Sequence, residues 1–192
     1  MTIKGFLANA VDTALDRSVV LGYTKVGSNI RRLWWPADPP PGAMAGKRVV
    51  VTGATAGIGE AMAESFARLG ATVHLLWRNE QKVSHSAAMI RDSVPPAAGG
   101  SVIEEICDIS DLDAVRAWTA DLSTRIDALH GLVHNAGLMP PERTESKQRH
   151  EMSLAAHVLG PHLMTHLLRE RLVAGPGSVV WMSSGGMYGS GL

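Results

Sequence analysis

Hydrophobic side chains recur every three to four residues near the start of the 192-residue chain. The apolar positions with this spacing are Ile3, Phe6, Leu7, Ala10, Val11, Ala14 and Leu15. The charged residues Asp12, Asp16 and Arg17 fall between them. This periodicity predicts an amphipathic helix.

A basic, tryptophan-containing segment and a proline-rich stretch follow this helix. Arg31 and Arg32 precede Trp34 and Trp35, and residues 39–42 read as a stiff linker. We therefore expect residues 1–46 to form a helical extension and residues 47–192 a separate domain. Tryptophan and basic side chains together favour the headgroup level of a bilayer, so residues 1–35 could make peripheral membrane contact. The alternative is packing on the chain's own domain or on a second subunit.

From residue 47 onward, short β-branched runs alternate with helical segments. The predicted strands are residues 48–52, 72–77, 101–107, 129–134 and 178–182. The predicted helices are residues 59–69, 79–93, 111–125 and 146–173, the last of which could break near Gly160 and Pro161. Asp111 can cap its helix with its carboxylate. This alternation predicts an α/β fold in which a doubly wound parallel sheet is covered by helices on both faces.

The run Thr52-Gly-Ala-Thr-Ala-Gly-Ile-Gly59 lies where the first predicted strand turns into the first helix of this region. In a dinucleotide site Gly53 permits the tight turn, Gly57 lets the backbone approach a pyrophosphate, and Gly59 lets helix pack on strand. The candidate cofactor-binding residues of this turn are Thr52, Gly53, Thr55, Ala56, Gly57, Ile58 and Gly59. A glycine turn without a ligand is the alternative, and a P-loop fits poorly because no Gly-Lys-Ser/Thr ends the run.

The end of the second predicted strand bears on cofactor choice. A carboxylate there would bind the adenosine ribose 2′-hydroxyl, but the sequence has Trp77, Arg78 and Asn79. Arg78 can bind a 2′-phosphate through two parallel hydrogen bonds. The sequence thus favours NADP(H) over NAD(H), with Arg78 and Asn79 near the phosphate. A solvated surface arginine is the alternative.

Together these segments resemble the short-chain dehydrogenase/reductase family. The glycine turn, Asp108 after the third strand, His134-Asn-Ala-Gly137 after the fourth and Ser183-Ser184 after the fifth resemble family motifs in order, from about residue 46 onward. The family's segment after the fourth strand is Asn-Asn-Ala-Gly, so His134 stands where the family has an asparagine. The resemblance implies a Rossmann fold whose cofactor also contacts Asp108, Ile109, Asn135, Ala136 and Gly137. Within the family, the chain looks most like the subgroup of dehydrogenase/reductase member twelve.

The resemblance also implies carbonyl–alcohol interconversion by a serine, a tyrosine and a lysine four residues after the tyrosine. Ser184 matches the serine that polarises the carbonyl, but Tyr188 is followed four positions later by Leu192 and is interpreted as a packing residue. We therefore interpret the chain as the N-terminal, five-stranded part of such an enzyme, truncated before Tyr-x-x-x-Lys and weakly active or inactive alone. The alternative is a non-catalytic NADP(H)-binding or interaction module.

Histidines supply the other candidate groups. The resemblance puts His157 where the family has an asparagine that organises a proton relay; the histidine could relay protons or only satisfy local hydrogen bonds. His162 and His166 lie one helical turn apart, but no third ligand has a supporting spacing, so we expect no metal site.

Charge and cysteine content bound the partners and the compartment. Eighteen basic residues balance eighteen acidic ones, so we do not expect a nucleic-acid partner. Cys107 is the only cysteine, which favours a reducing cytoplasmic compartment, and no apolar run approaches the ~20 residues needed to span a bilayer. The expected partners are a small carbonyl or alcohol substrate and, for a longer chain, a second copy.

Overall fold

The computed structural model describes residues 3–22 and 24–184. The chain divides into two compact units, one holding the N-terminal residues through Asp38 together with Ser183 and Ser184, the other Pro39–Met182. The break falls before the proline-rich stretch, earlier than the expected limit at residue 46. Met44 explains part of this difference, because its main-chain N–H bonds the Leu69 carbonyl and its side chain packs on the core of the second unit.

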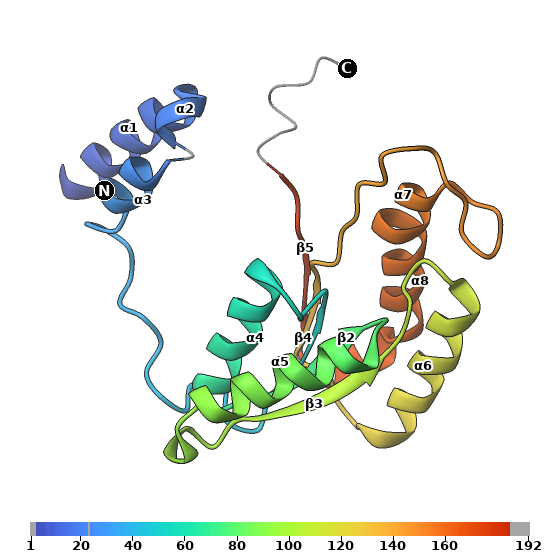
Figure 1. Cartoon of the computed structure of the whole chain (residues 1–192). Coiled ribbons are helices and arrows are strands. Elements are labelled where there is room, and N and C mark those ends of the chain that lie inside the picture. Colours follow the sequence, from blue (N-terminus) through green and yellow to red (C-terminus); the bar gives the residue numbers. More distant parts are fainter. Residues whose placement is uncertain (1–2, 23, 185–192) are drawn as a thin grey trace. The chain divides into compact units, whose positions relative to one another are not determined.

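The described residues of the N-terminal unit form three helices, which Figure 1 draws in blue: α1 Ile3–Arg17, α2 Val19–Gly22 and α3 Lys25–Arg31. Gly27 is buried where α3 passes α2, because an added Cβ would lie 2.3 Å from the Leu21 carbonyl oxygen. The Arg31 side chain bonds the carboxylates of Asp12 and Asp16 and the carbonyl of Gly22. No helix within residues 3–22 and 24–184 has the length and apolar character needed to cross a membrane.

The second unit is built on five parallel strands in the order β3-β2-β1-β4-β5. The strands are β1 Arg48–Thr52, β2 Thr72–Trp77, β3 Ser101–Ile106, β4 Gly131–His134 and β5 Ser178–Trp181. The intervening helices are α4 Gly57–Arg68, α5 Glu80–Ser93, η1 Pro96–Ala98, α6 Leu112–Arg125, α7 Met152–Leu154, η2 Ala155–Leu159, α8 Gly160–Leu167 and α9 Arg169–Ala174. The predicted doubly wound α/β fold is confirmed, and the strand order reverses between β1 and β4, where such folds bind ligands.

Successive residues of β1 belong to two separate hydrophobic cores, one on each face of the sheet. Val49 and Val51 pack with side chains of α4 and α5, whereas Val50 packs with Trp118 of α6 and Met164 of α8. Alternation of this kind explains why the strands read as continuous β-branched runs, since both faces of a covered parallel sheet are apolar.

A buried charged cluster lies within the core on the α6 side. The Glu105 carboxylate of β3 pairs with Nδ1 of His74 and accepts hydrogen bonds from the Trp118 indole and, in bidentate fashion, from the Arg125 guanidinium. Burial alone would raise the pKa of Glu105, but the bonds from His74, Arg125 and Trp118 lower it to about 2. Glu105 therefore stays ionised and ties β2 and β3 to α6.

The prediction of a long helix over residues 146–173 is wrong about where the helix starts and about where it is interrupted. Ser146 instead exchanges hydrogen bonds with His150, and Glu151 caps a helix that begins at Met152. Residues 155–159 form a π-helical turn, and α8 then runs through Gly160 and Pro161 without interruption. A wider π-turn relieves the proline's missing N–H and its steric demand, so the helix breaks only at Leu168.

Other predicted boundaries shift by one or two residues. α4 begins at Gly57 rather than residue 59, and β3 and β5 each end one residue early. β4 begins at Gly131 because the N–H of Leu129 bonds the Arg171 carbonyl instead of joining the sheet.

Candidate functional site

A small cavity of about 90 Å³ opens at the carboxyl ends of β1, β2, β3 and β4. It is lined by Gly53, Leu76, Trp77, Arg78, Cys107, Asp108, Ile109, Ala136, Gly137, Leu138 and Ala156. Six of these residues were predicted from the sequence to bind cofactor: Gly53, Arg78, Asp108, Ile109, Ala136 and Gly137. The cavity therefore brings together predicted residues from four strand ends.

Thr52 joins the end of β1 to the segment after β4. Its buried hydroxyl oxygen accepts hydrogen bonds from the main-chain N–H groups of Asn135 and Ala136, each at 3.0 Å. In return, the Asn135 side-chain amide donates to the carbonyls of Thr52 and Gly53. These four bonds fix the two walls of the cavity relative to each other, so Thr52 and Asn135 hold the site in shape.

The N-terminus of α4 has an open approach. Its N-cap is Ala56, which gives no side-chain hydrogen bond to the first-turn amides. Gly57 has φ +57°, and a Cβ added there would meet nothing within 4 Å. At Gly59, by contrast, an added Cβ would lie 2.3 Å from the Gly53 carbonyl oxygen. Uncapped amides beside open space suit a phosphate group, so the turn fits the pyrophosphate of a dinucleotide.

Arg78 and Asp108 face each other at the cavity. Nη1 of Arg78 lies 3.9 Å from Oδ2 of Asp108, and the arginine side chain is 59% exposed. The other oxygen of Asp108 accepts bonds from the N–H and hydroxyl of Ser110. Asn79, which was also predicted to bind cofactor, caps α5 by accepting a bond from the N–H of Lys82. Among the described residues, the guanidinium of Arg78 therefore has only a long, exposed ion pair, and it can take a new anionic partner.

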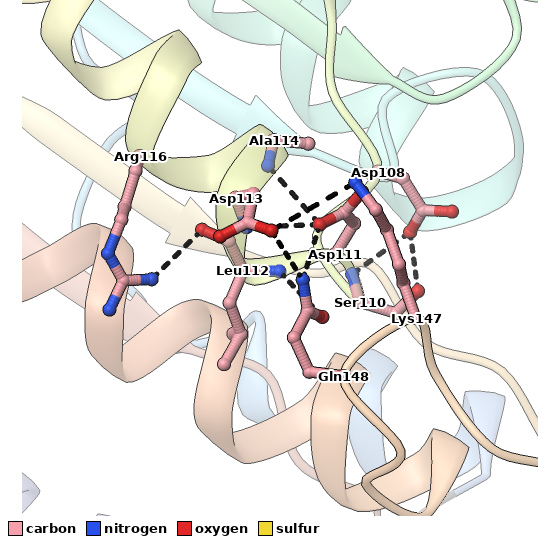
Figure 2. Close-up of polar contacts among 9 residues, drawn as sticks. All are labelled: Asp108, Ser110, Asp111, Leu112, Asp113, Ala114, Arg116, Lys147 and Gln148. Atoms are coloured by element: carbon pink, nitrogen blue, oxygen red, sulfur yellow. Dashed lines mark hydrogen bonds and ion pairs between the residues drawn. The ribbon is translucent and has the colours of Figure 1, made fainter.

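The turn after β3 is tied to the segment before α7, as Figure 2 shows. The Asp111 carboxylate caps α6, as predicted, by accepting from the N–H of Asp113, and it also bonds Gln148 and Lys147. The hydrogen bond from Gln148, supported by that from Lys147, lowers the pKa of Asp111 to about 2. This cluster holds the backbone beside Asp108 in place.

His157 lies in the π-helical turn, next to the segment after β4. Its Nε2 accepts a 2.9 Å hydrogen bond from the N–H of Leu138, whose side chain lines the cavity. Because Nε2 is an acceptor, the ring proton of the neutral histidine lies on Nδ1. The arrangement supports a local hydrogen-bonding role for His157.

His134 occupies the last position of β4 and is buried. Its Nε2 lies 2.8 Å from the Thr165 hydroxyl oxygen, and its ring packs against Trp181 with centroids 4.5 Å apart. The Thr165 hydroxyl donates its own proton to the Pro161 carbonyl, so His134 is the donor in their shared bond. Burial lowers the pKa of His134 to about 4, which keeps the ring neutral near pH 7.

Comparison with known proteins identifies the family. Residues 47–190 match the family model described as short chain dehydrogenase. The chain belongs to the short-chain dehydrogenase family. It is 34% identical over 154 residues to the short-chain dehydrogenase/reductase bet4 of Neocamarosporium betae, an alignment that covers 74% of this chain and 44% of that protein. It is 36% identical over 140 residues to human retinol dehydrogenase 12, covering 72% and 43%.

Solved structures agree with this assignment. A metagenomic short-chain oxidoreductase in complex with NADP aligns with TM-score 0.60 and 28% identity, over 71% of this chain and 61% of that one. The chain spans about half the length of the curated relatives that it matches. The resemblance to the family is thus confirmed, whereas the resemblance to member twelve stays a prediction.

Sequence reasoning missed five cavity residues of this member of the family: Leu76, Trp77, Cys107, Leu138 and Ala156. Trp77, Cys107, Leu138 and Ala156 each adjoin a predicted site residue, and Leu76 lies two positions before Arg78, so extending each motif by one or two residues would have found them. Burial raises the pKa of the Cys107 thiol to about 12, so Cys107 is an uncharged wall of the cavity rather than a nucleophile.

Two sequence predictions concern residues beyond the Pro39–Met182 unit. Ser184 lies beyond the Pro39–Met182 unit, so its role at the carbonyl stays a prediction. Tyr188 lies outside the described residues. Among the residues that the structure does describe, no three histidine, cysteine, aspartate or glutamate side chains are placed to hold a metal ion.

Proposed function

We propose that the chain is the cofactor-binding part of an oxidoreductase that interconverts a carbonyl and an alcohol with NADP(H). The observation that carries the cofactor preference is Arg78, an exposed guanidinium that follows β2 and forms a long ion pair with Asp108. A carboxylate at the end of this strand would favour the free ribose hydroxyl of NAD(H). NAD(H) is expected to bind more weakly because it lacks the charged phosphate for Arg78.

In this proposal the segments that follow the strands bind different parts of the cofactor. The amides at the start of α4, from Gly57 to Gly59, bind the pyrophosphate, and Thr55, Ala56 and Ile58 shape the turn. Asp108 and Ile109 contact the adenine side, while Asn135, Ala136 and Gly137 support the nicotinamide side. The bound cofactor supplies or accepts a hydride. Ser184 donates a hydrogen bond to the substrate oxygen.

We propose that His157 positions the segment after β4, which includes Ala136 and Gly137, through its hydrogen bond with the N–H of Leu138. A direct relay of protons through Nε2 would require this bond to break, because Nε2 is already an acceptor. The amide bond therefore favours positioning over relay for this side chain.

Nucleotide binding tests the cofactor assignment. Dissociation constants for NADPH and NADH would be measured by calorimetry on the full 192-residue chain, on Arg78→Asp and on the control Arg116→Asp, which changes an exposed arginine of α6. We expect Arg78→Asp to lower the preference for NADPH at least tenfold, roughly the contribution of one charged hydrogen-bonded pair. Arg116→Asp should leave the preference unchanged. An unchanged ratio in Arg78→Asp would refute the assignment.

For these 192 residues alone we propose cofactor binding with little or no turnover. Neither Tyr23 nor Tyr188 is followed four positions later by a lysine, and a tyrosine without a nearby cation is a poor acid at neutral pH. NADPH oxidation would be followed with aldehydes and ketones, including retinaldehyde, which the similarity to retinol dehydrogenases suggests. Turnover that Ser184→Ala abolishes would overturn this proposal.

A further inference from the structure

The third helix of the N-terminal unit has one packed side and one exposed side. Gly27 and Arg31, four residues apart, face the neighbouring helices: Gly27 lies against the backbone of α2, and Arg31 bonds Asp12, Asp16 and Gly22. Because residues four apart share a helix face, this pair defines the inner side of α3. Val26 is 56% exposed and belongs to the outer side.

Exposed apolar side chains continue directly beyond α3. Leu33 is 81% exposed, Trp35 53% and Trp34 37%. The backbone keeps turning here, because the N–H groups of Leu33 and Trp34 bond the carbonyls of Ile30 and Arg31. We call Lys25, Val26, Arg32, Leu33, Trp34 and Trp35 the Trp-rich patch. Large apolar side chains gathered at this density on a surface mark an interaction site.

The charged residues of the segment that contains the Trp-rich patch all have the same sign. Between Asp16 and Asp38 the chain contains four basic residues and no acidic one. Arg31 is used within the unit, where its side chain pairs with Asp12 and Asp16 and these bonds raise its pKa. Lys25 and Arg32 are exposed, and the described part of the chain offers neither of them a carboxylate. The patch therefore joins apolar rings to two cations that are not neutralised.

We propose that the Trp-rich patch seats the N-terminal unit on the surface of an anionic lipid bilayer. Tryptophan prefers the headgroup level, where its apolar ring and its N–H are both accommodated. Leu33 and Val26 would enter the acyl boundary, while Lys25 and Arg32 bind lipid phosphates. A phosphate backbone would use the cations but leave Leu33 in water, so a nucleic acid fits the patch less well.

Vesicle co-sedimentation tests the proposal with the full chain. Vesicles of phosphatidylcholine alone would be compared with vesicles containing 30% phosphatidylglycerol, a fraction chosen to be about that of a strongly anionic leaflet. We expect binding to the anionic vesicles and a marked loss in high salt. Arg32→Gln should weaken binding about fivefold, the share of one basic residue near the surface. The double variant Trp34→Ser and Trp35→Ser should weaken it at least tenfold.

Two matched controls guard against a general effect of the substitutions. Val173→Ser removes an exposed apolar side chain of the other unit, and Arg116→Gln removes an exposed arginine there; both should bind vesicles like the wild type. Circular dichroism checks that each variant is folded. The absence of anionic-vesicle binding, or binding unchanged in the double tryptophan variant, would overturn the proposal. A lowered melting temperature of the double tryptophan variant, together with no binding of the wild type to vesicles, would also overturn the proposal, because the patch would then pack on protein.

Discussion

The main-chain N–H of Leu138 donates a 2.9 Å hydrogen bond to Nε2 of His157, which joins the segment after β4 to the π-helical turn before α8. The segment includes Ala136 and Gly137, two residues that line the cavity. A side chain that was a relay candidate from sequence resemblance thus has an identifiable partner on the wall of the proposed cofactor site. π-Helical turns inside α-helices are frequent at functional sites, and this one directs His157 toward the loop.

Replacing His157 tests the importance of this bond. His157→Ala leaves the Leu138 N–H without its acceptor, and we expect NADPH to bind about fivefold more weakly, equivalent to about 1 kcal/mol for one partly solvated hydrogen bond. His157→Gln should restore much of the affinity, because its carbonyl oxygen can replace Nε2. The control His166→Ala changes an exposed histidine of α8 and should have no effect. Equal affinities for wild type and His157→Ala would show that the bond does not position the loop.

Thr52 should contribute to stability through its hydroxyl oxygen rather than its methyl group. Thr52→Val keeps the shape but removes the acceptor shared by the Asn135 and Ala136 amides, so we expect a loss of about 2–4 kcal/mol in the free energy of unfolding. Thr52→Ser keeps the oxygen and should cost only about 1 kcal/mol for the missing methyl. Urea unfolding of both variants measures the difference. If Ser proved as damaging as Val, the two amide bonds would not explain the role of Thr52.

Gly57 and Gly59 should respond differently to the same substitution. Gly59→Ala places a methyl against the Gly53 carbonyl, and we expect a loss of about 2–3 kcal/mol from overpacking. Gly57→Ala meets open space, so its cost should be about 1 kcal/mol for the left-handed backbone. That methyl would nevertheless occupy the approach to the α4 amides, and NADPH affinity should fall at least tenfold. Thermal melting and calorimetry separate the two effects, and undiminished NADPH binding by Gly57→Ala would place the pyrophosphate elsewhere.

The sequence was sufficient for the central strands β1, β2 and β4 because each lies in a two-sided core. Val49, Val50 and Val51 must all be apolar when both faces of the sheet are covered, and such a run is easily recognised. The Asp111 cap was equally readable, because an N-cap depends on one local side chain and the first amides of its helix. Local signals of this kind gave the fold and the four strand ends that form the cavity.

Features set by specific contacts rather than by hydrophobic periodicity were missed. The helix was predicted to start at residue 146, but the bonds between Ser146 and His150 compete with helix formation there. Nothing in the local pattern shows that Glu105 meets Arg125 or that Leu138 meets His157. Likewise, Ala156 becomes a cavity residue only once the π-helical turn is brought to the ends of the strands. Such contacts depend on packing rather than on periodicity.

Buried His134 gives the fold a specific sensitivity to acid. Its pKa is about 4 in the folded chain, below the ordinary value of about 6.5, so the unfolded chain takes up the proton first as the pH falls. The stabilising effect is complete above about pH 6.5 and declines as the pH falls toward 4. Between pH 7 and pH 5 this histidine alone should lower the free energy of unfolding by about 2 kcal/mol.

The measurement is urea unfolding at pH 7 and pH 5 for the wild type, His134→Asn and His85→Asn. His134→Asn replaces the histidine with the residue that the family motif has, and it removes the buried titrating group; its stability should therefore change less between the two pH values. His85 is exposed on α5, so His85→Asn should keep the wild-type difference. If His134→Asn lost as much stability at pH 5 as the wild type, other groups would account for the acid sensitivity, and the buried neutral state of His134 would not.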